Sequence, residues 1–177
     1  MNSKLKHIEH DLLLSRAERL AIPIEATDEN LAVERVLVFF AMGEKFAIPL
    51  AQVEAVTRII DIFPIPHTPA HIPGVIRRRG QTIALVNLRF FFYPGTEALI
   101  DEDYAVAVRV KKKLFSLQIE DVEGVVNLLK TNILPVPDSY DRAMSPYLSG
   151  ITRDDMAILN LDEIVMTSNF GTTEIQG

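Results

Sequence analysis

Two histidines are the residues of this sequence whose spacing comes nearest to a metal site. His67 and His71 are four residues apart, a spacing that suits metal ligands only when both lie on one helix. Pro69 lies between them and interrupts a helix. A closed site also needs further ligands, which the neighbouring sequence does not supply. We therefore expect two loop histidines and no metal.

Three acidic residues, Glu120, Asp121 and Glu123, are the nearest approach to an acid–base pair. Carboxylates do such work when they face each other across a cleft with opposed pKa shifts. Nothing in the sequence indicates a cleft, so a solvated acidic turn is the simpler interpretation. The G-x-G-x-x-G, Walker A, G-x-S-x-G and H-E-x-x-H motifs are also missing. We expect no enzyme activity and no cofactor.

Three consecutive arginines, Arg77, Arg78 and Arg79, precede Gly80. In a strand, Arg77 and Arg79 point one way and Arg78 points the other. Two guanidinium groups suffice to bind a carboxylate or a partner's backbone. A second interpretation is a single-stranded nucleic-acid surface that adds aromatic residues and the lysines at 111–113. The net charge of -6 and the pI near 5.2 count against nucleic acid.

Composition indicates a folded protein of modest size. The 177 residues suit one domain, or two very small ones sharing a core, and 48% of them are hydrophobic. There is no cysteine, which agrees with a reducing compartment. No apolar run approaches the roughly 18 residues that span a bilayer, and His10 and Asp11 interrupt any signal peptide. We expect a cytoplasmic location.

The arginines lie in the central stretch of the chain, residues 66–89. A proline-broken connector leads to a strand, GVIRRR, and a turn at Gly80 leads to a second strand, TIALV. Asn87 is a good N-cap for a short helix, LRFFF, whose phenylalanines are expected in the core. The two strands therefore meet at a turn formed by Arg79 and Gly80, which we call the Arg-Gly corner, and we expect its arginine side chain to be exposed.

The remaining pattern is mostly that of short strands. Residues 36–42 suit a strand buried on both faces, and Tyr104 to Val110 alternate clearly before a lysine turn and a return strand. Val122 and Val125, three apart, predict a helical turn that Gly124 breaks. Further strands are expected at 45–50, 56–65, 148–153 and 156–160, one helical turn at 50–53, and a helix at 161–166. Eight to ten short strands favour an antiparallel all-β barrel or sandwich.

The two ends differ from this pattern. Residues 3–20 have helical apolar spacing, and an acidic tether follows them to residue 34. We leave open whether this helix is a loosely docked appendage or binds a partner. The tail, residues 168–177, is polar and expected to be disordered.

Four segments together resemble the CheW-like chemotaxis adaptors. They are VLVFFAMGEKFAIPLAQVEAV, TPAHIPGVIRRRGQTIALVNLR, LFSLQIEDVEGVVNL and YLSGITRDDMAILNLDEIV, within residues 35–166. The resemblance implies an all-β fold of two small five-stranded SH3-like barrels packed around a shared core, with short helices. It divides the chain into an N-terminal helix and tether (1–34), a CheW-like domain (35–167) and the tail.

The resemblance also implies a function without catalysis. A member of this family is a scaffold that couples transmembrane chemoreceptors to the histidine kinase CheA. One barrel docks on the kinase's own CheW-like regulatory domain, and the groove between the barrels takes the receptor's helical hairpin tip. Contact with the membrane would then be indirect, through receptors.

Site residues follow from the same resemblance. The receptor groove is expected to include Val53, Arg79, Gly80, Ser116, Val122 and Val125. Contacts to the kinase or the array are expected at Gly74, Val75 and Arg77. Arg77 and Arg78 replace an Asn-Leu pair typical of the family, Ala55 stands where an acidic residue is common, and Asn87 replaces an aspartate. The first two departures change the charge of the presumed receptor face.

Overall fold

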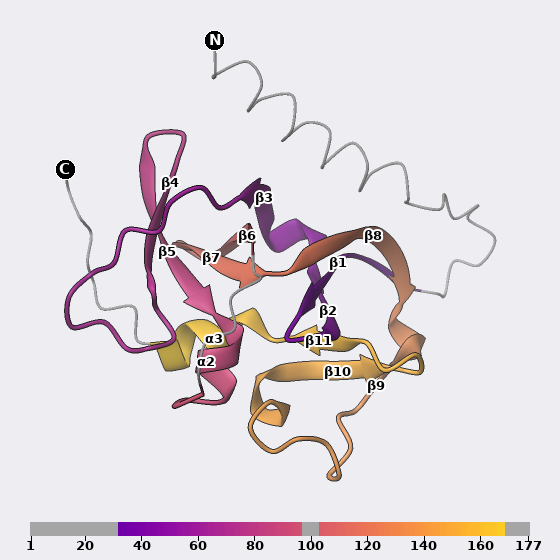
Figure 1. The fold of residues 1–177 in the computed structure, drawn as a ribbon. Helices are drawn as coiled ribbons and strands as arrows, with labels where there is room; N and C mark the ends of the chain where they lie inside the picture. Colours follow the sequence, from indigo (N-terminus) through magenta and orange to yellow (C-terminus); the bar gives the residue numbers. More distant parts are fainter. Residues whose placement is uncertain (1–31, 97–102, 169–177) are drawn as a thin grey trace.

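Two curled β-sheets make up the protein (Figure 1). The structure is a computed structural model that describes residues 32–96 and 103–168. The helix predicted at 3–20 lies outside the described residues, as do the tether up to residue 31 and the tail from residue 169. The predicted bounds of the tether and the tail are wrong where the structure describes them: residues 33 and 34 begin the first strand, and Ser168 is the buried last residue of the final helix.

The first sheet has the strand order β8-β1-β2-β11-β10-β9 and the second has the order β3-β6-β7-β5-β4. The strands of the first are β1 (Val33–Ala41), β2 (Glu44–Pro49), β8 (Asp121–Leu129), β9 (Ile133–Leu134), β10 (Leu148–Thr152) and β11 (Ala157–Leu159). Those of the second are β3 (Val53–Arg58), β4 (Gly74–Arg78), β5 (Gln81–Asn87), β6 (Tyr104–Val110) and β7 (Lys113–Ile119). Short helical elements connect them: η1 (Leu50–Gln52), α2 (Leu88–Phe92), η2 (Lys130–Asn132), η3 (Ser145–Tyr147) and α3 (Leu161–Ser168).

Each sheet curls until its two edges are joined by the chain itself. In the first sheet, the edge strands β8 and β9 are consecutive and only η2 separates them. In the second, Phe63 forms a bridge to Val75 on the edge strand β4, with both N–H···O distances at 2.9 Å. Gly74 permits this approach, because a Cβ atom there would lie 2.3 Å from the carbonyl oxygen of Phe63.

The predicted fold class, two small SH3-like barrels around a shared core, is therefore confirmed. The first sheet counts six strands rather than the expected five. The difference arises because η2 divides one curved stretch of chain into β8 and β9.

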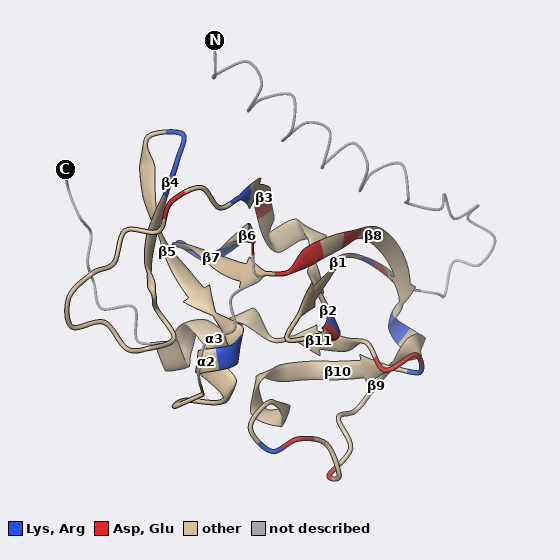
Figure 2. Ribbon diagram, in the orientation of Figure 1, with Lys and Arg blue, Asp and Glu red and all other residues tan. Residues whose placement is uncertain are grey.

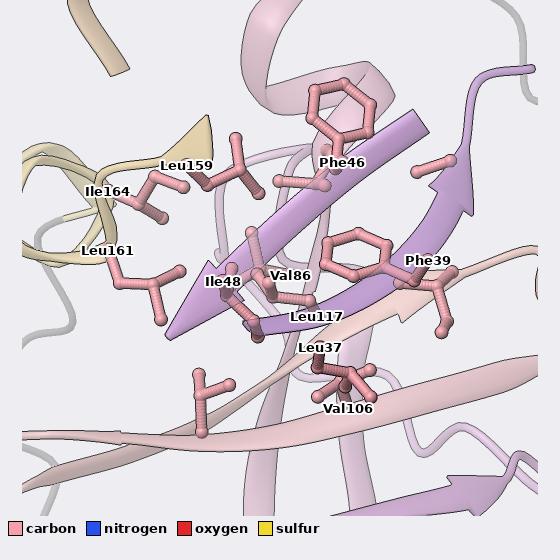
Figure 3. Packing of buried hydrophobic residues seen from close by; sticks show 14 of the residues in the cluster. Leu37, Phe39, Phe46, Ile48, Val86, Val106, Leu117, Leu159, Leu161 and Ile164 are labelled. Atoms are coloured by element: carbon pink, nitrogen blue, oxygen red, sulfur yellow. The ribbon is translucent and has the colours of Figure 1, made fainter. Parts of the chain in front are cut away.

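Three clusters of buried side chains fill the fold. The largest takes residues from both sheets, including Leu37 and Phe46 from the first and Val106 and Leu117 from the second, and we call it the shared core (Figure 3). One smaller cluster has residues of the first sheet and Met156 from the turn between β10 and β11. The other has residues of the second sheet and of the connector that follows β3. Strand β1 contributes side chains to two clusters, one on each of its faces. Leu37 and Phe39 lie in the shared core, and Val36 and Val38 lie in the cluster of the first barrel.

Several local predictions are confirmed. Val106, Val108 and Val110 of β6 all enter the shared core, as the alternation indicated. The side chain of Asn87 accepts a hydrogen bond from the backbone N–H of Phe90 (3.2 Å) and caps α2. Of the three phenylalanines of α2, Phe92 is buried and the other two are half-buried.

The predicted helical turn at 122–125 is wrong, because these residues belong to strand β8. Its register to β1 shifts between Val38, which faces Gly124, and Phe39, which faces Val122. Glu123 is the extra residue of this β-bulge. The bulge lets Val122 and Val125 pack on the same shared core despite a spacing of three, which is why their pattern resembled a helix.

Candidate functional site

The Arg-Gly corner is a tight hairpin turn at the end of β4. Arg78 pairs with Gln81, and the two residues between them have positive φ angles, 47° at Arg79 and 78° at Gly80. This is the backbone of a type I′ turn, whose twist suits a two-residue hairpin. Both turn residues are exposed, and the hairpin extends away from the body of the second barrel (Figures 1 and 2).

Two half-buried valines line the margin where the two barrels meet, which we call the seam. Val53 begins β3 directly after η1, and η1 contacts both β1 of the first sheet and β6 of the second. Val122 lies on β8, paired with Phe39 of β1. Both valines pack against the shared core yet keep part of their surface in solvent. Short apolar side chains of this kind let a partner's helix approach closely.

An ion pair that the sequence did not indicate lies beside the seam. Arg109 Nε and Glu54 Oε1 are 2.6 Å apart. The bond from Arg109 lowers the pKa of the Glu54 carboxyl below its usual value, and Arg78 adds to this electrostatically. Glu54 is the extra residue of a β-bulge in β3, since Val53 faces Val108 while Ala55 faces Ala107. We call Glu54, Arg78, Arg79 and Arg109 the arginine cluster; through Glu54 it adjoins Val53.

Two of the expected groove residues are buried. Ser116 has no exposed surface, and it pairs with Leu85, a residue of the second barrel's own cluster. Val125 is 2% exposed and belongs to the shared core. Both side chains therefore contribute to packing. Of the other residues expected in the groove, Val53 and Val122 are half-buried, and Arg79 and Gly80 are exposed.

The residues expected at a kinase contact lie on β4. Gly74 is buried and serves the closure of the barrel, Val75 is half-buried and Arg77 is exposed. Val75 and Arg77 line an open pocket of about 310 Å³ with Phe63 and Thr82. Phe63 is 50% exposed, so this face offers an apolar ring beside a positive charge.

The acidic residues at 120–123 bind neighbouring groups of the first barrel. The carboxylate of Glu120 accepts from the backbone N–H of Gly43 at 3.0 and 3.1 Å. Glu123 forms an ion pair with Lys45 at 2.7 Å. These partners give the carboxylates a structural role in holding the turn between β1 and β2.

The two histidines differ in their surroundings, and the described residues contain no group of three His, Cys, Asp or Glu side chains arranged for a metal ion. His67 is an exposed loop residue. His71 packs edge-on against Phe91 of α2, with ring centroids 5.4 Å apart, and its backbone carbonyl accepts from Asn87. Burial lowers the pKa of His71, and a hydrogen bond to the backbone of Ser168 partly opposes this. His71 therefore joins the connector to α2 and to the end of α3.

We expect the protein to lose stability as the pH falls below about 6.5, the value of an unperturbed histidine. The lowered pKa of His71 means that the unfolded chain binds its proton first, so the stabilisation is complete above the unfolded pKa and is lost toward the folded one. Urea unfolding at pH 7.5 and 5.5 measures this change. His71→Phe keeps an aromatic ring against Phe91 and should lose less stability over the same interval. An equal loss in both proteins would contradict the assignment to His71.

No helix of the described residues is long and apolar enough to cross a membrane.

Comparisons with known proteins agree with this architecture. The chain is 26% identical over 140 residues to the chemotaxis protein CheW of Helicobacter pylori, covering 78% of this chain and 85% of that one. It is 24% identical over 143 residues to the chemotaxis protein CheW of Treponema pallidum, covering 78% and 82% of the two chains. The solved structure of the scaffolding protein TtCheW from Thermoanaerobacter tengcongensis superposes with a TM-score of 0.63 at 24% identity, over 72% of this chain and 89% of that chain.

A family model then connects the sequence segments to the fold. The CheW-like domain matches residues 35–168, which include both sheets except the first two residues of β1. The chain belongs to the CheW-like domain family.

Proposed function

We propose that this chain is a non-catalytic adaptor of chemosensory signalling that couples chemoreceptors to a CheA-type histidine kinase in the cytoplasm. The observation that carries the proposal is the CheW-like domain match over residues 35–168. The relatives' names, chemotaxis protein CheW and scaffolding protein, support the same role. An adaptor needs two separate binding surfaces, and the described residues offer two candidates.

The receptor surface is the seam together with the Arg-Gly corner. Val53 and Val122 supply half-buried apolar contacts, and Arg79 and Gly80 are exposed at the turn. A helix that lies along such a margin gains from apolar burial, and an arginine at the rim fixes its orientation. The receptor's helical hairpin tip is the partner that fits this shape.

The kinase surface is the outer face of the β4–β5 hairpin. Val75, Arg77 and Thr82 line the pocket with the half-exposed ring of Phe63. An exposed aromatic ring bordered by polar groups has the composition of a protein interface centre. The kinase's own CheW-like regulatory domain is the proposed partner here.

Binding of this chain to each partner alone tests the proposal. A purified CheA-type regulatory domain and a receptor hairpin tip, each titrated with the chain by calorimetry, should both bind. Val53→Glu should weaken binding of the receptor tip and leave binding of the kinase domain unchanged, because it puts a charge on the seam. Phe63→Ala should weaken binding of the kinase domain and leave binding of the receptor tip unchanged. The absence of detectable binding to both partners would refute the adaptor role.

A further inference from the structure

Arg78 occupies an unusual place for an arginine. It is the last residue of β4, directly before the exposed turn. Its side chain is half-buried, whereas those of Arg77 and Arg79 on either side are exposed. This alternation follows from the strand, which directs Arg78 to the face opposite Arg77. The Nε atom of Arg78 is buried, with no hydrogen-bond partner among the described residues.

The positive charges around Arg78 outnumber the negative ones. Burial lowers the pKa of the Arg78 guanidinium, and the like charge of Arg79 lowers it further. Glu54 attracts Arg78, but its carboxylate is bound to Arg109 at 2.6 Å. Three ion pairs occur within residues 32–96 and 103–168, and only the pair between Arg109 and Glu54 involves the arginine cluster. The arginine cluster therefore has three guanidinium groups for one carboxylate.

A carboxylate from outside would give the Nε–H group of Arg78 an acceptor and would offset part of the excess positive charge. The planar guanidinium presents its N–H groups in a fork that matches a carboxylate, and such charge-assisted bonds are about twice as strong as neutral ones. A buried N–H without an acceptor is costly, so an arriving acceptor gains more there than at an exposed arginine. We propose that Arg78 is an anchor for an acidic side chain of a protein partner bound at the adjoining seam. The proposal rests on the receptor surface described under Proposed function and specifies the chemistry of that partner.

The charges around the cluster favour a protein acid over nucleic acid. The chain carries a net charge of -6, which opposes a continuous line of phosphates. Acidic residues also occur on β8, where Figure 2 shows red; they are Asp121 and Glu123. A single carboxylate satisfies Arg78 without drawing further negative charge onto that surface.

The side-chain Nε–H resonance of Arg78 gives a direct readout in the full-length protein. Titration with an acetylated, amidated tetraglutamate peptide should shift this resonance downfield as the Nε–H gains an acceptor. Arg78→Gln should lower the affinity for the peptide about tenfold or more. Arg78→Lys, which keeps the charge and loses the fork, should recover only part of that affinity.

Arg77→Gln is the matched control, since it removes the same charge one residue away on the opposite face. It should change the affinity less than twofold. Equal losses in Arg77→Gln and Arg78→Gln, or an unmoved Nε–H resonance, would overturn the proposal. Oligothymidylate that binds the cluster more tightly than tetraglutamate would also overturn it and assign the cluster to nucleic acid. The assay contains neither receptor nor kinase, so its result is distinguishable from a failure of the adaptor role.

Discussion

Replacing Phe46 with alanine should lower the free energy of unfolding by about 3–5 kcal/mol, the usual range for a buried phenylalanine. Phe46 has no exposed surface and stacks on Phe39 with ring centroids 6.0 Å apart. Both rings lie in the shared core, which takes side chains from both sheets (Figure 3). The cavity would therefore weaken both barrels together. Urea unfolding, followed by far-UV circular dichroism and by hydrogen exchange in each sheet, measures the loss.

Met166→Ala is the control for this experiment. Met166 is 72% exposed on α3, and its removal should change stability by no more than about 0.5 kcal/mol. The shared core predicts a single transition in both variants. If the second sheet of Phe46→Ala kept its stability while the first sheet unfolded alone, the barrels would be independent and the shared core would not be what joins them.

Reversing the charge at the corner, Arg79→Glu, should lower the affinity for a receptor tip about 10- to 100-fold, which corresponds to about 1.4–2.7 kcal/mol. Arg79 is exposed at a turn with φ 47°, where its side chain supports little of the fold. The substitution removes an interface anchor and repels an acidic partner. Affinity for the kinase domain should stay the same, because the proposed contacts there involve the pocket at Phe63. Calorimetric titration of each partner measures both affinities.

Two further variants separate charge from turn geometry. Arg153→Glu makes the same change in charge at an exposed residue of the β10–β11 turn and should leave receptor affinity unchanged. Arg79→Asn removes the charge, while asparagine tolerates a positive φ well, so the hairpin should keep its stability. Receptor affinity that survives Arg79→Glu would exclude the corner from the receptor surface.

Features determined by neighbouring residues could be predicted from the sequence. The Arg-Gly corner, the Asn87 cap and the alternation of β6 each depend on residues close in the chain. Their physical causes, a turn with positive φ, an unpaired N–H group and a period of two, leave direct traces in sequence.

Features that depend on an irregular register could not be predicted. The bulge at Glu123 gave β8 an apparent helical spacing, and the bulge at Glu54 aimed that carboxylate at Arg109 from another strand. The alternating pattern of β7 did place Ser116 on the face opposite Phe115 and Leu117. It does not indicate whether that face is exposed to solvent or lies inside a barrel. The closed second sheet buries Ser116, which only the tertiary structure reveals.

The adaptor role requires that one copy of the chain hold receptor and kinase together. A receptor hairpin tip immobilised on beads, mixed with the purified CheA-type regulatory domain, tests this requirement directly. The account predicts that the kinase domain is retained only when the chain is added, and that Arg79→Glu abolishes the retention. Retention of the kinase domain without the chain, or no retention although the chain itself is bound, would contradict it.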